Sequence, residues 1–331
     1  MPITGLPHPR KASDFYDPPL SAQRGGFWKD LVALVRSAGF VCRVEISQTR
    51  DYVAAYQRAV TPIAESVLGR PESHPYTDDP MCEECIRVCL FLAGYCKMAG
   101  VAARVEVALL GAAVARVYDD LIDDYGDDTL LARLSVLFAG GVFEPANDAE
   151  RLFYLLYSEL ERRLGCGRDH PIYEAMIALH KAQARSREQR DLRIPTSRLV
   201  EIAQEKGGCA LLVLQYLVKP DMSAAERNVM RRLGGLMQMI DDHQDVEVDR
   251  RAGVATTATR GLLSLALICR QLREMRPSVR VLYGRDQPLF GLIYMSLCVT
   301  FLRRYLPEKL IDGPVQQGLV RCVRLNERLR D

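Results

Sequence analysis

The stretch VEVALLGAAVARVYDDLIDDYGDD, residues 105–128, decides the fold class predicted for this chain. Its apolar residues recur at helical spacing from Val105 to Val117, and a run of aspartates follows directly. The spacing predicts one long helix whose end carries carboxylates. Similar periodicity recurs through most of the chain, and the sequence shows no alternating strand bounded by hairpin turns. The sequence therefore predicts an all-α fold.

The first acidic cluster places like charges one helical turn apart, Asp119 below Asp123 and Asp120 below Asp124. Like charges at this spacing repel each other and weaken a helix unless cations neutralise them. Carboxylate oxygens suit Mg²⁺, which keeps several waters and also accepts phosphate oxygens. A calcium loop of the EF-hand type is excluded because two of its ligand positions would hold leucine and tyrosine.

A second acidic cluster lies in QMIDDHQDVEVD, residues 238–249. Asp241, Asp245 and Asp249 are spaced four residues apart and so form a column over two helical turns, with Asp242 beside it. Either cluster alone also fits a solvated helix end. Two clusters of one shape in a helical chain favour a shared metal site.

Basic residues occupy the sequence between the two clusters. The segment KAQARSREQRDLR, residues 181–193, fits a solvated helix face for most of its arginines. Lys206 precedes Gly207 and Gly208, and paired glycines let a backbone approach a phosphate closely. A phosphate contact and a simple surface loop both remain open for Lys206.

The chain resembles the class I isoprenoid synthases in three motifs and their order. These are DDxxD from Asp119, then Lys206, then QxxDDxxD from Gln238. The segment EQRDL, residues 188–192, is similar to a stretch of trans-prenyltransferases. DRRAG, residues 249–253, is similar to squalene and phytoene synthases, and Arg304-Tyr305 resembles a C-terminal pair of terpene cyclases. The motifs cover roughly residues 100–260.

The resemblance implies a single-domain helical bundle around a deep apolar cavity. The two acidic motifs would hold three Mg²⁺ ions at its mouth, and an allylic prenyl diphosphate would be the substrate. The implied metal ligands are Asp119, Asp120, Asp123, Asp241, Asp245 and Asp249, the first four of these being the implied catalytic residues. The candidate diphosphate contacts are Arg193, Lys206, Arg251, Arg304 and Tyr305.

The choice between a terpene synthase and a prenyltransferase depends on whether the chain carries basic residues that would bind a second diphosphate. Chain-elongating prenyltransferases carry an N-terminal basic motif and an arginine pair soon after the first aspartate motif. Residues 124–131 read DYGDDTLL here, so the sequence favours a one-substrate terpene synthase, a carbon–oxygen lyase. The alternatives are a head-to-tail or head-to-head prenyltransferase and a non-catalytic helical protein that binds prenyl diphosphates. The absence of Glu-x-x-His pairs disfavours a di-iron bundle more strongly than these alternatives.

Substrate length is predicted from the turns before Asp119. Gly111, Val114 and Ala115 would line the cavity wall below the mouth, and all three are small. They predict a deep cavity and a substrate of C15 or longer, with C20 favoured. The alternative is that these residues only let another helix pack closely.

The chain has 331 residues with a formal net charge of +2, which offers no excess charge for non-specific nucleic-acid binding. The sequence predicts a loosely ordered arm over residues 1–25 and one helical domain over residues 26–331. No stretch is apolar enough for a membrane span, and no secretion signal is present. We expect a cytoplasmic protein, with a homodimer as a further expectation.

The ten cysteines are expected to be reduced thiols. Cys82, Cys85, Cys89 and Cys96 begin with a CxxC spacing but also share one helix face. No second pair completes a tetrahedral zinc site, so we interpret this face as buried core.

Overall fold

The computed structural model describes residues 49–69, 80–285 and 287–305, and within them the chain is all-helical with no strand. The all-α prediction is confirmed. The predicted N-terminal arm, residues 1–25, lies outside the described residues. Residues 49–59 are helical, and the helices that follow are α2 (Thr61–Leu68), α3 (Pro80–Ala99), α4 (Val105–Tyr125), α5 (Asp128–Phe138), α6 (Asp148–Leu164), α7 (Pro171–Ser186), the 3₁₀ turn η3 (Arg187–Arg190), α8 (Thr196–Tyr216), α9 (Ala224–Gln244), α10 (Val246–Ala252), α11 (Leu265–Tyr283) and α12 (Pro288–Tyr305).

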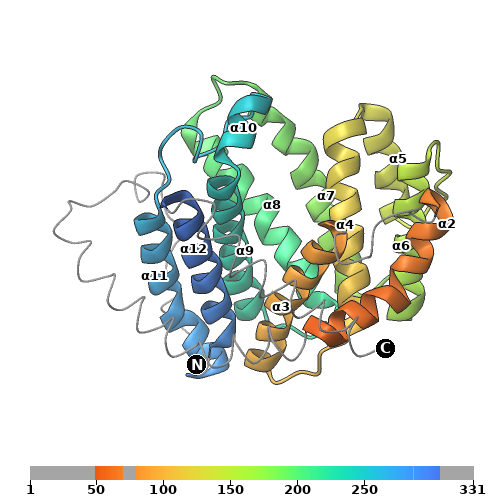
Figure 1. Ribbon diagram of the computed structural model, residues 1–331, viewed down its shortest axis with the longest axis horizontal. Coiled ribbons are helices and arrows are strands. Elements are labelled where there is room, and N and C mark those ends of the chain that lie inside the picture. Colours follow the sequence, from red (N-terminus) through yellow and green to blue (C-terminus); the bar gives the residue numbers. More distant parts are fainter. Residues whose placement is uncertain (1–48, 70–79, 286, 306–331) are drawn as a thin grey trace, which may run out of the picture.

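The helices form a bundle around one large hydrophobic core (Figure 1). α8 packs most extensively against α9 and next against α7, while α4 packs against α3 and α6. α11 lies on α9, and α12 lies on α3. The C-terminal ends of α4 and α9 lie at the same, upper end of the bundle, where α10 follows α9 (Figure 1). This topology brings the two acidic clusters to one end.

Two helix starts follow the signals in the sequence. Ser223 caps α9, and its side chain and that of Glu226 form the reciprocal bonds of a capping box. Pro171 occupies the first turn of α7, behind the N-cap residue His170. Both predicted starts are confirmed. Among the described residues, no helix combines the length and apolar character needed to cross a bilayer.

Glycines bring α8 and α9 into very close contact. A Cβ atom on Gly207 would lie 2.2 Å from the carbonyl oxygen of Gly234, and one on Gly234 would lie 2.2 Å from that of Gly207. Gly208 and Gly235 meet the opposite backbone almost as closely. Lys206 therefore lies within a helix, and the surface-loop interpretation is wrong. The glycines serve helix packing, and this sets Lys206 beside α9.

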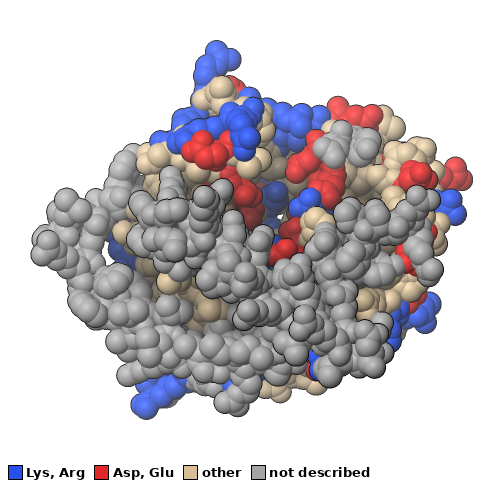
Figure 2. All heavy atoms as spheres, in the orientation of Figure 1, with Lys and Arg blue, Asp and Glu red and all other residues tan. Residues whose placement is uncertain are grey.

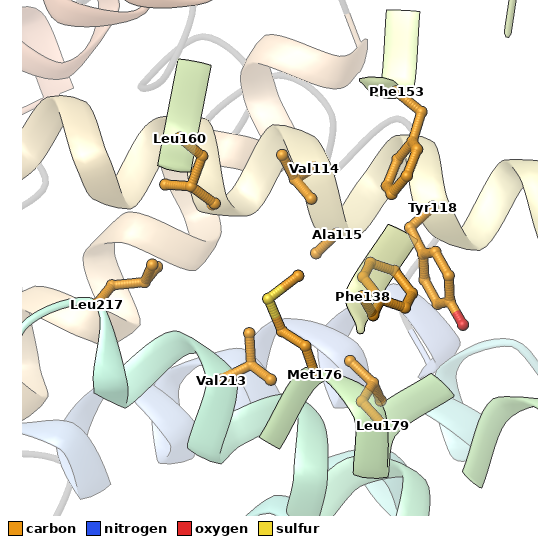
Figure 3. A pocket seen from close by; sticks show the side chains of 11 residues that line it. Val114, Ala115, Tyr118, Phe138, Phe153, Leu160, Met176, Leu179, Val213 and Leu217 are labelled. Carbon is orange, nitrogen blue, oxygen red and sulfur yellow. The ribbon is translucent and has the colours of Figure 1, made fainter. Parts of the chain in front are cut away.

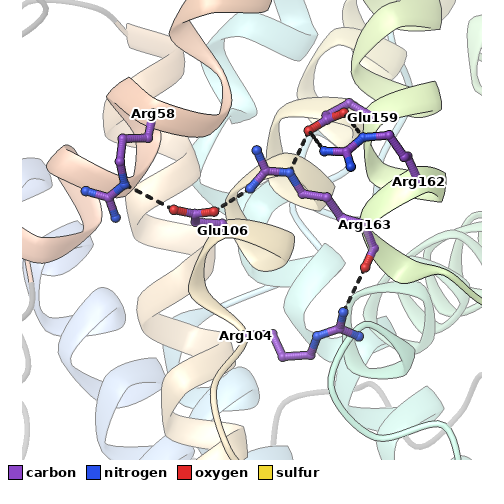
Figure 4. A network of polar contacts seen from close by, with 6 residues as sticks. All are labelled: Arg58, Arg104, Glu106, Glu159, Arg162 and Arg163. Atoms are coloured by element: carbon purple, nitrogen blue, oxygen red, sulfur yellow. Dashed lines mark hydrogen bonds and ion pairs between the residues drawn. The ribbon is translucent and has the colours of Figure 1, made fainter.

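An ion-pair network ties the lower part of α4 to its neighbours (Figure 4). Glu106 accepts from Arg58 Nε at 3.1 Å and also pairs with Arg163 of α6. Arg163 Nε reaches Glu159 at 2.7 Å. Hydrogen bonds from Arg58 and Arg163 hold the pKa of Glu106 below its usual value. We call this set the base network; it comprises Arg58, Arg104, Glu106, Glu159, Arg162 and Arg163.

The predicted cysteine face of α3 is core. Cys82, Cys85, Cys89 and Cys96 are all buried as free thiols. Burial raises the pKa of the Cys89 thiol far above its usual value and that of Cys96 to about 11. Both thiols therefore stay protonated and behave as small apolar side chains.

Candidate metal and diphosphate site

The first carboxylate column consists of Asp119, Asp120 and Asp123, on the last two turns of α4. Asp119 is half-buried, and the other two are exposed. Burial raises the pKa of Asp119, Lys206 opposes this rise, and the negative charge of Asp123 adds to it. The column therefore carries the crowded charge that its spacing predicts.

The second carboxylate column consists of Asp241 on α9, Asp245 at the junction with α10, and Asp249 on α10. Desolvation first, and then repulsion from Asp245, raises the pKa of Asp241 to about 6 and that of Asp249 to about 6. Asp241 is nevertheless accessible to solvent. A side chain that is both accessible and desolvated lies on the wall of a concavity, where protein surrounds it on most sides.

The two columns face each other. Burial and the closer charge of Asp245 are the main causes of the raised pKa of Asp241 and of Asp249. Negative charges of the first column add to both: Asp119 raises the pKa of Asp241 further, and Asp123 raises that of Asp249. The positive charge of Lys206 lowers the pKa of Asp119, Asp241 and Asp249, so Lys206 lies near both columns. Figure 2 shows acidic side chains on both sides of a hollow near the upper ends of α4 and α9, with basic atoms inside it. The structure thus brings both predicted clusters to one mouth.

Asp242, the neighbour of the second column, points into the protein. It is 8% exposed, and burial raises its pKa to about 7. Gln238 Nε2 lies 3.1 Å from an Asp242 oxygen and 3.3 Å from an Asp241 oxygen. Gln238 therefore links the two aspartates and orients Asp241 toward the mouth.

A set of hydrogen bonds supports α10 and the loop that follows it. Gln189 O accepts from Ala255 N at 2.8 Å, and Gln189 Nε2 donates to Ala255 O at 3.0 Å. Arg260 donates to the carbonyl oxygens of Leu192 and Ile194. These bonds join η3 to the segment after α10 and so hold the Asp249 end of the second column in place.

Three charged residues at the mouth were not identified from the sequence. Glu84 and Arg87 come from α3, and Arg116 lies one turn before Asp120 on α4. The charge of Glu84 reaches both Asp119 and Asp241, and Arg87 opposes the burial that raises the pKa of Asp245. For Glu84 and Arg87 the one available signal was their position on the side of α3 opposite its cysteine face.

No contact among the described residues places the other predicted diphosphate-binding residues at the mouth. The Arg193 side chain is 94% exposed and pairs with Asp191 at 3.6 Å. Arg251 Nε donates to the carbonyl oxygen of Glu247 at 3.1 Å. Arg304 and Tyr305 end α12, and their side chains lie outside those described.

An apolar cavity lies below the first column (Figure 3). Gly111, Val114 and Ala115 line it, as predicted for the wall, and aromatic rings from α4, α5 and α6 lie at one end. Its volume is about 40 Å³, far below the roughly 300–1,000 Å³ of typical ligand pockets. The remaining lining residues are Tyr118, Phe138, Phe153, Leu160, Met176, Leu179, Val213 and Leu217. A deep cavity therefore stays a prediction.

Gly111 also permits close packing. A Cβ atom there would lie 2.4 Å from a methyl carbon of Leu217, beyond the end of α8. The alternative role of the small residues, close helix packing, therefore applies at this position, although the same residue lines the cavity.

The chemistry of the mouth fits Mg²⁺ that is shared with a diphosphate. Within the described part of the chain, no group of three or more His, Cys, Asp or Glu side chains is arranged to hold a metal ion alone. Mg²⁺ usually binds one or two carboxylates and takes its remaining ligands from water and substrate phosphates. Facing, mutually repelling carboxylates can supply that partial set from each wall.

Comparison with known proteins gives no family for this chain. No family model matches the sequence, and neither a curated protein nor a solved structure matches it. The functional argument therefore rests on the site itself.

Proposed function

We propose that this protein is a Mg²⁺-dependent class I terpene synthase that ionises an allylic prenyl diphosphate of C15 or longer. The observation that carries the proposal is that Lys206 lies close enough to both carboxylate columns to lower the pKa of their members. The carboxylates of the two columns and Glu84 outnumber Lys206, Arg87 and Arg116, so the mouth has residual affinity for further cations. Cations bound there create a site for a diphosphate group.

The protein's own groups have distinct roles in this scheme. Asp119 and Asp123 on one wall, and Asp241, Asp245 and Asp249 on the other, would hold Mg²⁺, whose positive charge stabilises the departing diphosphate. Lys206 would add a charge-assisted hydrogen bond to the same leaving group. Both interactions strengthen as negative charge develops on the diphosphate, so they lower the barrier to ionisation.

The apolar side of the site would protect the carbocation. The cavity wall offers apolar side chains and the aromatic rings of Tyr118, Phe138 and Phe153. Such walls exclude water, and aromatic faces stabilise a cation without reacting with it. A C15 or C20 chain exceeds 40 Å³, so the cavity must widen on binding. Met176 lines the cavity, and its flexible side chain suits such repacking.

Incubation with C10 to C25 prenyl diphosphates and Mg²⁺ tests this proposal. We expect release of inorganic pyrophosphate and a hydrocarbon or alcohol product, and loss of both in EDTA. Absence of pyrophosphate release with every substrate would contradict it and favour the non-catalytic binding protein.

A prenyltransferase remains the second candidate because of one observation. Arg87 and Arg116 place cations at the mouth from α3 and α4, where the sequence after Asp123 offers none. They could help bind a second diphosphate. Addition of isopentenyl diphosphate distinguishes the two activities, since only a chain-elongating enzyme would accumulate longer prenyl diphosphates. The pairwise coupling of two allylic substrates would instead point to the head-to-head reaction.

A further inference from the structure

Arg116 bridges two carboxylates at the mouth. Its Nε and Nη2 atoms meet the two carboxylate oxygens of Asp120 at 3.1 and 2.7 Å. Its Nη1 atom donates to Glu84 of α3 at 3.1 Å. One guanidinium group thus occupies both oxygens of a predicted metal ligand and also holds a second carboxylate on another helix.

This arrangement conflicts with metal binding at Asp120. A planar guanidinium matches a carboxylate at two points, and the paired oxygens are those that a metal ion would need. A cation approaching them would also meet the positive charge of Arg116. Asp120 therefore cannot ligate a metal ion until Arg116 moves.

We propose that Arg116 is a resident counter-ion of the first column, which competes with the metal ion for Asp120 and moves onto Glu84 when the metal ion binds. The inference rests on the proposed metal-dependent function and adds a control on its metal affinity. In the metal-free protein Arg116 offsets the repulsion between Asp120 and its neighbours.

The geometry makes the exchange easy. The side chains of Arg116 and Asp120 are 42% and 50% exposed, so water screens their attraction and a divalent ion can displace the pair. Glu84 already holds one nitrogen of the guanidinium, so Arg116 keeps a partner after it leaves Asp120.

Calorimetric titration of the full-length protein with MgCl₂, with and without inorganic pyrophosphate, tests the competition. We expect Arg116→Gln to bind Mg²⁺ about three- to tenfold more tightly than the wild type, because one competing charge is removed. The matched control is Arg162→Gln, which removes a similar two-point pair with Glu159 on α6, within the base network. The control should leave the Mg²⁺ affinity unchanged.

A double-mutant cycle tests the role of Glu84. Glu84→Gln should weaken Mg²⁺ binding in the wild type, because Arg116 then remains on Asp120 and one attractive charge is lost. In the Arg116→Gln background only the lost charge acts, so the loss should be clearly smaller. Equal losses in both backgrounds would overturn the proposed movement onto Glu84.

The outcomes separate this inference from the proposed function. Equal Mg²⁺ affinity in the wild type and Arg116→Gln would overturn the competition while leaving a metal-dependent enzyme intact. Weaker binding in Arg116→Gln would also overturn it, since Arg116 would then support the site. Absence of Mg²⁺ binding in both proteins, with and without pyrophosphate, would overturn the inference and the proposed function together.

Discussion

The two ends of α4 carry carboxylates in opposite situations. At the lower end, Glu106 lies between Arg58 and Arg163, and these arginines lower its pKa (Figure 4). At the upper end, Asp119 is desolvated and lies near Asp123, and its pKa is raised despite Lys206. The same helix thus holds one carboxylate whose charged form is stabilised by its surroundings and another whose charged form is destabilised.

This difference suggests that the two ends of α4 serve different purposes, stability at the lower end and function at the upper end. A paired carboxylate such as Glu106 contributes to holding α4 against its neighbours. A crowded carboxylate such as Asp119 opposes folding, and proteins retain such groups where a ligand relieves the strain. We therefore propose that the upper end of α4 is the functional end. The predictions below test this contrast, starting with the largest expected effect.

Replacing a crowded carboxylate should reduce activity most. Asp119→Asn and Asp241→Asn should each lower turnover by roughly 100-fold or more, since each removes charge stabilisation of the leaving group. Both variants should be at least as stable as the wild type in urea unfolding at pH 8 without metal, because repulsion and burial of charge are relieved. Asp148→Asn, at the exposed start of α6, is the control and should keep full turnover. Full turnover in either mouth variant would refute the metal-site assignment.

The middle of α4 should determine substrate length. Ala115 lines the cavity one turn below Asp119 and is small and half-buried. Ala115→Phe should shift the preference among C10, C15 and C20 diphosphates toward the shortest by about tenfold, because a ring fills space needed by the chain. Ala115 is a better choice for this test than Gly111, where even a Cβ atom meets Leu217. An unchanged preference in the folded variant would show that this face does not hold the substrate.

At the lower end of α4, Glu106→Gln should lower stability and leave turnover unchanged, whereas a change at the mouth should lower turnover and leave stability unchanged or higher. Two arginines lose their partner, and the loss of such solvent-screened pairs should lower the free energy of unfolding by about 1 kcal/mol. Turnover should be unchanged, since the base network does not contribute to the mouth. A stable variant with reduced turnover would show that the two ends are coupled.

The last prediction concerns the pH dependence of stability. Burial raises the pKa of Asp242 to about 7, from the usual value near 4. Between those values the folded state binds more protons than the unfolded chain, so stability falls as pH rises. Unfolding of the metal-free protein between pH 5 and pH 8 should therefore show a steeper decline in the wild type than in Asp242→Asn. Parallel curves would show that Asp242 is solvated.

The sequence predicted the parts of this molecule that depend on local spacing. Helix periodicity identified the all-α class, and the four-residue spacing of the aspartates placed the first column on one helix face. The second column was also predicted on one helix, but the structure divides it between α9 and α10 at Asp245. The capping box at Ser223 and the proline at the start of α7 also follow local rules. These features need no knowledge of neighbouring helices.

Features that depend on contacts between helices were not predictable. Lys206-Gly207-Gly208 suggested a loop because glycine is a poor helix former, but close packing against Gly234 outweighs that propensity. Glu84 reaches the mouth from α3, a relation that no spacing on α4 or α9 encodes. The size of the cavity is likewise set by side chains from several helices.

The central claim is that the two columns face each other and hold metal ions together with a diphosphate. A crystal structure of the protein with Mn²⁺ and inorganic pyrophosphate, read from the anomalous signal of manganese, tests it most directly. We predict manganese ions at the mouth with ligands from Asp119 or Asp123 on α4 and from Asp241, Asp245 or Asp249 on α9 and α10, and the pyrophosphate between the columns beside Lys206. Manganese bound to one column alone or elsewhere, with the mouth empty, would contradict the account.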